Sequence, residues 1–210
     1  MTVGTAEQIA SSSATTGYRR VVGNQQDDVV LFKPGAGNPE LALTYASYGA
    51  WQRIADNGTE LKIDTSFFTY GVETTPSEMP KTGSATYQTK IDGQFADTRG
   101  VFALAGDSHF DANFASGAVN FTMNPVGRNV ADGSYANFGQ LVLTGSIKTP
   151  DQAYKGNEFS AETGSAGAYA AQMQGAFYGP GAAELGGTFL MNERGGGQGR
   201  GSGAVVGKKN

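Results

Sequence analysis

The fold is decided by a stretch near the carboxyl end that reads Gly175-Ala176-Phe177-Tyr178-Gly179-Pro180-Gly181-Ala182-Ala183-Glu184-Leu185-Gly186-Gly187-Thr188-Phe189. Up to its Gly-Pro-Gly break the side chains alternate. Met173 and Phe177 fall on one face of an extended segment, and Gln172 and Gln174 fall on the other. This alternation predicts a half-buried antiparallel strand.

The connection that follows is tight. Gly179-Pro180-Gly181 ends the strand, because proline cannot donate a ladder hydrogen bond and glycine permits a positive φ. The segment Ala182-Ala183-Glu184-Leu185 predicts about one helical turn, which Gly186 and Gly187 would end. A returning strand is expected from Thr188 onward, so the whole stretch predicts a strand, a turn and a strand.

Short apolar runs of the same kind extend outward through the rest of the chain, separated by polar and glycine-rich turns. A hairpin with a polar tip is predicted over 18–32. Further strands are predicted at 41–51, 61–72, 85–91, 101–105, 110–114, 119–123, 140–147, 158–161 and 203–208. Longer loops are expected at 125–138 and 148–169. No amphipathic helix longer than about ten residues is predicted, and this pattern favours an antiparallel β-sandwich or β-barrel.

A barrel is the preferred architecture. The predicted inward faces mix small and large residues, with Gly175 near Phe177 and Gly187 near Phe189, as the interior of a small closed barrel requires. Each strand has one apolar and one polar face, which argues against a barrel whose exterior contacts lipid.

Composition narrows the function. The chain has 210 residues, of which 32 are glycine and only 16% are charged, and its formal net charge is -4. No basic stripe is present, so nucleic-acid binding is not expected. The absence of cysteine excludes disulfides and thiolate sites, and a single histidine excludes multi-histidine metal sites. No apolar run reaches about 18 residues, so no transmembrane helix is expected.

The amino-terminal sequence leaves the cellular location open. Met1-Thr2-Val3-Gly4 does not match the pattern of a signal peptide. It fits either the start of a cytosolic protein or a piece cut from an exported one.

Three stretches carry a resemblance to a known family. The hairpin at 175–189 is the most specific of them. The second is Phe68-Thr69-Tyr70-Gly71 followed by Met79-Pro80-Lys81-Thr82-Gly83-Ser84-Ala85-Thr86-Tyr87, and the third is Phe110-Asp111-Ala112-Asn113-Phe114-Ala115-Ser116-Gly117-Ala118-Val119. With the terminal Gly203-Ala204-Val205-Val206-Gly207, the chain resembles, over about 41–208, the carboxyl-terminal β-barrel of transferrin-binding protein B and the transferrin-binding-protein-like solute-binding proteins.

The resemblance implies an all-β fold: an eight-stranded antiparallel up-and-down barrel with a filled interior and a small N-terminal strand region. It predicts an arm and a short hairpin packed on the barrel over 1–40, and the barrel itself over 41–210. It implies export, either as an outer-membrane surface lipoprotein or as a released protein, although the lipidated cysteine is absent from this chain. Relatives bind transferrin, lactoferrin, haem or complement factor H, and many work beside a TonB-dependent outer-membrane receptor.

Five residues are candidates for binding. If haem binds, His109 is a candidate axial ligand, because histidine is the usual protein ligand of haem iron; a surface histidine without a ligand is the alternative. Tyr45 and Tyr48 are partner candidates near the end of the strand 41–51, which we expect to be the first barrel strand. Arg128 and Tyr135 are partner candidates on the loop 125–138, because long loops on a rigid barrel commonly carry binding. The alternatives are core packing for the aromatic residues of 41–51, a solvated face for Arg128 and a tolerated surface insertion for the loop 125–138.

No enzyme is predicted. Gly195-Gly196-Gly197-Gln198-Gly199-Arg200-Gly201 lacks the Gly-Lys-Ser/Thr ending of a phosphate loop, and Gly-x-Ser-x-Gly is absent. We therefore expect a non-enzymatic surface or secreted binding protein for iron or haem acquisition. A structural or host-interaction barrel with no soluble small ligand is the alternative.

Overall fold

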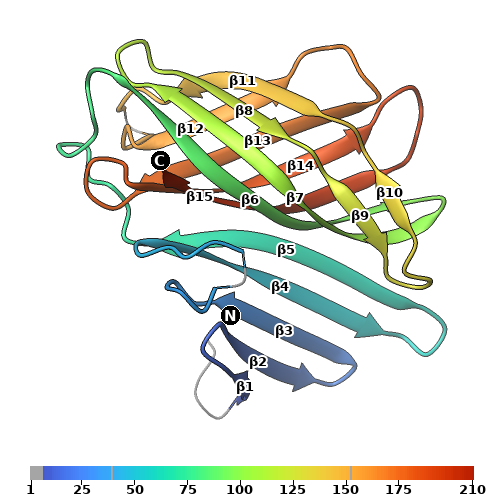
Figure 1. Ribbon diagram of the computed structural model, residues 1–210. Helices are drawn as coiled ribbons and strands as arrows, with labels where there is room; N and C mark the ends of the chain where they lie inside the picture. Colours follow the sequence, from blue (N-terminus) through green and yellow to red (C-terminus); the bar gives the residue numbers. More distant parts are fainter. Residues whose placement is uncertain (1–6, 39, 152) are drawn as a thin grey trace.

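Fifteen strands and no helix make up the part of the chain that the computed structural model describes, residues 7–38, 40–151 and 153–210 (Figure 1). They form two sheets, one of five strands and one of ten. The all-β prediction is confirmed.

Eight strands of the larger sheet close into an antiparallel barrel, as predicted. The closure is made because β7 pairs with β8 at one end of the strand order and β15 pairs with β6 within it. The barrel strands are β6 (Ser84–Asp97), β7 (Gly100–Asn113), β8 (Ala118–Met123), β11 (Leu141–Ile147), β12 (Glu158–Thr163), β13 (Tyr169–Tyr178), β14 (Glu184–Glu193) and β15 (Arg200–Lys209).

The structure confirms the hairpin predicted from the opening stretch, which is formed by β13 and β14. The prediction of a helical turn over 182–185 is wrong. β14 already begins at Glu184, and Gly186 and Gly187 lie inside it, paired with Ala176 and Gly175. The reversal is completed earlier than expected, because Gly179, Gly181 and even Ala182 adopt positive φ values of 71°, 62° and 57°.

Glycines inside the barrel make room for aromatic rings. A Cβ on Gly203 would lie 2.4 Å from the Phe189 ring, and one on Gly175 would lie 2.6 Å from the Phe159 ring. Around them Phe110 contacts the rings of Tyr87, Phe121, Phe159 and Phe177. The interior is therefore filled by large rings lying on glycine backbone, which explains the mixture of small and large inward residues.

The prediction of a long loop over 125–138 is wrong. The segment forms a hairpin of β9 (Val126–Asn129) and β10 (Tyr135–Asn137), and β9 pairs with the first half of β7. Asn124-Pro125 separates β8 from β9, because proline cannot donate to the ladder. Gly127 lies under the rings of Phe102 and Phe138, so the hairpin continues the barrel wall toward one end.

The smaller sheet has the order β1-β2-β3-β4-β5 and projects below the barrel in Figure 1, with β4 and β5 nearest to it. Its strands are β1 (Gln8–Ser11), β2 (Thr15–Val22), β3 (Gln25–Phe32), β4 (Ala46–Asp56) and β5 (Leu61–Gly71). The hairpin predicted over 18–32 is confirmed as β2 and β3.

The expectation that the strand at 41–51 begins the barrel is wrong. This segment enters β4, which pairs with β3 and β5 in the smaller sheet. Alternation predicted a strand correctly but does not identify its partner, and the barrel closes without β4 because β15 pairs with β6. The division of the chain into folding units at 1–40 and 41–210 stays a prediction.

A second apolar cluster joins the sheet to the outside of the barrel. It contains Leu43, Ala46 and Tyr48 from the sheet side and Ala176, Tyr178, Ala204 and Val206 from the barrel. On its edge the buried Glu184 carboxylate accepts hydrogen bonds from the backbone N–H groups of Thr44, Tyr45 and Ala46 at 2.7–2.8 Å. Glu184 thus fixes the point at which the chain enters β4.

Candidate partner-binding groove

The histidine singled out from the sequence lies on the outside of the barrel. His109 is an exposed residue of β7, and its Nε2 lies 3.0 Å from Asp111 Oδ1 on the same strand. The neighbouring Phe110 points inward, where it is fully buried. The structure therefore places His109 on a convex polar face beside a carboxylate.

The two tyrosines of the 41–51 segment lie at the junction of sheet and barrel. Tyr48 is 1% exposed, its ring stacks on Phe32 at 4.3 Å, and its hydroxyl donates to Asp92 Oδ2 at 3.0 Å. Burial raises the pKa of Tyr48 above its ordinary value. Tyr45 is half-buried, and its ring lies against the backbone of Gly179. Both side chains pack at this junction, and neither stands on a barrel rim.

Trp51 lies on the opposite face of β4 from Tyr48. It is half-buried, and its Nε1 donates to Asp27 Oδ1 at 3.0 Å. The Arg53 guanidinium lies 5.2 Å from the centre of the indole ring and its Nε also bonds Asp27. Trp51 therefore packs within the outer face of the smaller sheet.

Arg128 and Tyr135 are brought together. They face each other directly across the β9–β10 hairpin, and both are exposed, with Tyr135 the more prominent at 75%. Beyond them the hairpin tip carries the exposed Val130. These residues stand at the end of the barrel where β9–β10 approaches the β4–β5 hairpin (Figure 1).

Between these two hairpins lies a groove with a volume of about 810 Å³. We call it the junction groove. The smaller sheet forms one wall through β4 and β5, and the barrel forms the other through β6, β7, β14 and β15. Its lining residues are Gln52, Ile63, Asp64, Thr65, Gln94, Ala96, Val101, Val130, Leu190, Asn192, Arg200, Gly201 and Ser202.

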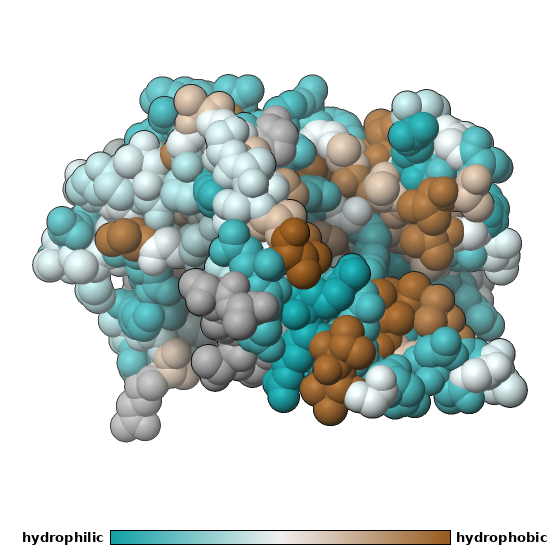
Figure 2. All heavy atoms as spheres, turned by 90° about the horizontal axis from the view of Figure 1, so that it is seen from below, coloured by the Kyte–Doolittle hydropathy of each residue, from teal (hydrophilic) through white to brown (hydrophobic). Residues whose placement is uncertain are grey.

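The junction groove combines exposed apolar side chains with neutral polar ones. Ile63 and Leu190 are about half exposed, and Val101 and Val130 are also exposed. Asp64 and Arg200 are its two charged residues, and Arg200 Nη1 donates to Asn192 Oδ1 at 3.2 Å. Seen from below, hydrophobic side chains gather on the right half of the surface and are interspersed with polar ones (Figure 2). Apolar anchors amid a polar rim are the composition of a protein-binding surface.

The sequence did not single out the groove residues. Ile63 belongs to a strand whose alternation is that of a core strand, so its exposure depends on where β5 lies relative to the barrel. One signal was available: the segment 61–70 carries apolar residues on both faces, with Ile63 and Phe67 on one and Phe68 and Tyr70 on the other. A barrel strand with a polar exterior would not show this.

Nowhere among the described residues do three or more acidic, histidine or cysteine side chains form a cluster able to hold a metal ion. No helix in that part of the chain has the length and hydropathy needed to span a membrane.

Solved structures share the fold. Transferrin-binding protein B from Haemophilus parasuis Hp5, in its Trp-176-Ala mutant, superimposes with a TM-score of 0.61 at 21% identity, over 95% of this chain and 37% of that one. The N-lobe domain of lactoferrin-binding protein B from Moraxella bovis gives 0.52 at 16% identity, over 87% of this chain and 79% of that one. At these identities the likeness concerns the fold alone.

Sequence comparison goes further. Transferrin-binding protein B of Haemophilus influenzae is 28% identical over 164 residues, which cover 71% of this chain and 26% of that protein. The Neisseria meningitidis protein of the same name is 29% identical over 150 residues, covering 66% and 21%. The chain thus spans about a quarter of the curated relatives it matches. A family profile described as the C-lobe and N-lobe beta barrels of Tf-binding protein B matches residues 79–209, more than half of the chain, and the chain belongs to that family.

Proposed function

We propose that the chain is an exported, non-enzymatic binding protein that takes part in iron acquisition at the cell surface or after release from it. The observation that carries the proposal is the junction groove, in which exposed apolar side chains from the sheet and the barrel lie among polar side chains, most of them uncharged. Family membership supports the choice of partner, since the matched relatives are named for binding transferrin.

The proposed partner is an iron-carrying protein of the transferrin class. Ile63, Leu190 and Val130 would supply apolar contacts, while Arg128 and Tyr135 would extend the surface along β9–β10. A TonB-dependent outer-membrane receptor is the proposed second partner, since iron bound outside the cell must still cross the outer membrane. A lipid anchor outside this chain would hold the protein at that membrane.

Surface plasmon resonance against immobilised iron-loaded and iron-free serum transferrin tests the proposal. Ile63→Lys and Val130→Lys should each weaken binding at least about tenfold, because a charge would replace an apolar contact. The matched control is Val142→Lys, which changes an exposed valine of β11 on the side of the barrel away from the sheet (Figure 1). Absence of wild-type binding, or equal losses in all three variants, would contradict the proposal.

Haem is a second candidate ligand in iron acquisition. His109 is the residue proposed to coordinate the haem iron. Absorption titration of the wild type and His109→Ala with haemin decides this point. A Soret shift that disappears in the variant supports haem ligation, and no shift in the wild type excludes it. If neither transferrin nor haem binds, the result favours the alternative function, that of a structural or host-interaction barrel.

A further inference from the structure

β5 is the edge strand of the smaller sheet, and β4 is its ladder partner. In an antiparallel ladder, successive residues direct their N–H and C=O groups alternately toward the partner and away from it. Two bonds show which residues of β5 face β4: Asn57 N–H donates to the Glu60 carbonyl, and Val72 N–H donates to the Tyr45 carbonyl. Even-numbered residues therefore bond to β4.

It follows that the odd-numbered residues of β5 present their backbone groups to the open edge. These residues are Leu61, Ile63, Thr65, Phe67 and Thr69. The edge is long, since nine residues from Leu61 to Thr69 span roughly 30 Å. Natural proteins usually cover or disrupt such an edge, because it is a template for pairing with another strand.

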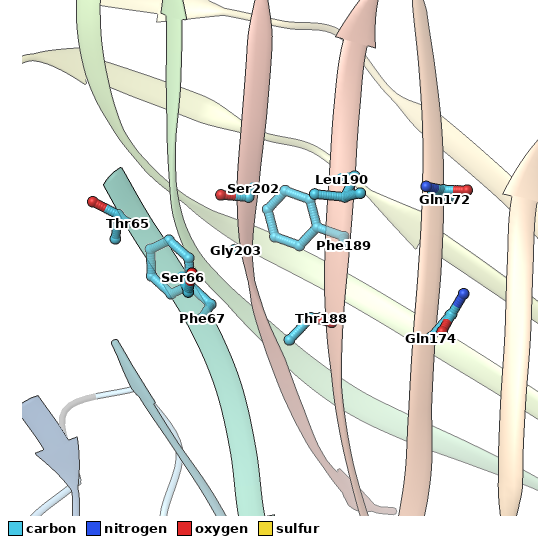
Figure 3. A pocket seen from close by; sticks show the side chains of 10 residues that line it. All are labelled: Thr65, Ser66, Phe67, Gln172, Gln174, Thr188, Phe189, Leu190, Ser202 and Gly203. Atoms are coloured by element: carbon cyan, nitrogen blue, oxygen red, sulfur yellow. The ribbon is translucent and has the colours of Figure 1, made fainter. Parts of the chain in front are cut away.

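The open edge faces a groove on the outside of the barrel, shown in Figure 3. This edge groove has a volume of about 320 Å³. Three consecutive residues of β5, Thr65 to Phe67, line one side of it, so the groove follows the backbone of the strand. The other side is formed by β13, β14 and β15. Thr65, Leu190 and Ser202 also line the junction groove, so the two grooves are continuous.

Beyond the edge groove, the end of β5 and the chain that follows it contact the barrel. Glu73 forms a bridge with Tyr178, and the hydroxyls of Thr69 and Tyr178 lie 3.3 Å apart. The free edge of β5 therefore ends near Thr69. An extended chain entering from the junction groove would run beside β5.

The lining of the edge groove indicates what would occupy it. No ionisable side chain lines it; its polar side-chain groups are the amides of Gln172 and Gln174 and the hydroxyls of Thr65, Ser66, Thr188 and Ser202. Leu190, 48% exposed, supplies an apolar floor. Amides and hydroxyls bond uncharged peptide groups, whereas a charged side chain placed here would lose water without gaining a counter-ion.

We propose that an extended, uncharged peptide segment of a partner protein binds in the edge groove as a sixth strand beside β5. Its backbone pairs with the odd-numbered residues of β5, and its alternate side chains lie on Leu190 and between the two glutamines. Strand addition of this kind takes affinity from the backbone and specificity from alternate side chains. The proposal does not depend on transferrin being the partner.

Amide hydrogen exchange measured by NMR tests the free edge in the wild-type protein. The amides of Ile63, Thr65 and Phe67 should exchange at least about tenfold faster than those of Asp64, Ser66 and Phe68, which bond to β4. Equal protection of the two sets would show that the edge is already satisfied and would overturn the proposal.

Selection from a phage library of random octapeptides tests the occupant. Enriched peptides should carry no charge at alternate positions, should slow exchange at Ile63, Thr65 and Phe67, and should bind Thr65→Pro at least about tenfold more weakly. Proline removes only an outward N–H and is tolerated on edge strands. Thr65→Val is the matched control, because it loses the hydroxyl and keeps the N–H.

If Thr65→Pro does not fold, Leu190→Lys replaces it, since it places a charge on the groove floor without altering β5. Failure to enrich any peptide, or equal binding by the wild type and the decisive variant, overturns the proposal. A wild type that dimerises through β5, as judged by its native mass and that of the variant, assigns the edge to a second copy and also overturns it. Transferrin binding is measured separately, so either proposal can fail alone.

Discussion

Glu184 is the residue that ties the amino-terminal half of the chain to the barrel. Its carboxylate is 2% exposed and accepts three backbone hydrogen bonds from residues 44–46. Glu184→Gln should lower the free energy of unfolding by at least about 2 kcal/mol, because the charge-assisted bonds are lost and the new amide N–H₂ faces backbone donors. Urea denaturation followed by tryptophan fluorescence measures the change.

Glu162→Gln is the control for that prediction. Glu162 lies on β12 and is exposed, so its substitution should change the free energy of unfolding by less than about 0.5 kcal/mol. Equal effects of the two substitutions would show that the three backbone bonds contribute nothing beyond those made to water.

Gly203 shows why glycine is required inside the barrel wall. A Cβ at this position would lie 2.4 Å from the Phe189 ring and 2.5 Å from the Asp92 carbonyl oxygen, and the carbonyl cannot move without breaking the ladder. Gly203→Ala should cost about 1–3 kcal/mol of stability. At Gly164 no heavy atom lies within 4 Å of a built Cβ, so Gly164→Ala should be neutral. Thermal unfolding of both variants checks this, and a neutral Gly203→Ala would contradict it.

At the scale of whole strands, the local sequence pattern predicted where strands occur better than it predicted which strands pair. The strand, turn and strand of 172–191 follow from alternation and from Gly179-Pro180-Gly181, and the structure confirms them. The helical turn over 182–185 failed because the sequence does not reveal that Glu184 is anchored by residues 44–46, far away in the chain. Likewise β9 looked like a loop, because its pairing with β7 depends on a long-range register.

The candidate site was less predictable than the fold. Arg128 and Tyr135 were named from a polar loop, and the structure pairs them across a hairpin. Ile63 and Leu190 were not named: Ile63 alternates as a core residue does, and Leu190 shares its strand face with the polar residues Thr188 and Asn192. Their exposure arises where β5 diverges from the barrel, which depends on how the two sheets are arranged. The one trace in the sequence is that the segment 61–70 carries apolar residues on both faces.

The contact between β4 and β6 should make the junction sensitive to pH. Asp92, which accepts the Tyr48 hydroxyl bond, has a pKa raised above its ordinary value, chiefly because burial disfavours the charged carboxylate. The neighbouring Glu40 also has a raised pKa, by burial and by the charge of Asp92. A raised pKa means that the folded state binds the proton more tightly than the unfolded chain does. The stability that protonated Asp92 contributes is therefore fully present below its ordinary pKa, and it is lost as pH rises through the raised pKa.

Asp92→Asn removes this titration and keeps an oxygen that accepts the Tyr48 bond. The variant should gain stability relative to the wild type as pH rises from about 3.5 to 7. Urea unfolding of both proteins across that range measures the difference, which cancels the titration of groups outside this contact. A difference that is constant with pH would contradict the prediction.

For the molecule as a whole, the two apolar clusters imply two levels of stability. The barrel encloses its own cluster, which includes Tyr87, Phe110 and Phe177, whereas the smaller sheet depends on the junction cluster around Tyr48. A single-layer sheet has little core of its own, so β2 and β3 should stay folded only while β4 is held against the barrel.

Tyr48→Ala tests that dependence, because it removes the largest side chain that the sheet contributes to the junction. Hydrogen exchange should accelerate over residues 15–71, while the barrel strands over 84–209 keep their protection. Phe177→Ala, inside the barrel, should accelerate exchange in both parts, since the junction is built on the barrel wall. Equal acceleration in both parts for Tyr48→Ala would mean that the molecule opens as one unit. A boundary in protection near residue 72 would place β4 and β5 with the amino-terminal hairpin as one folding unit and replace the division at residue 41.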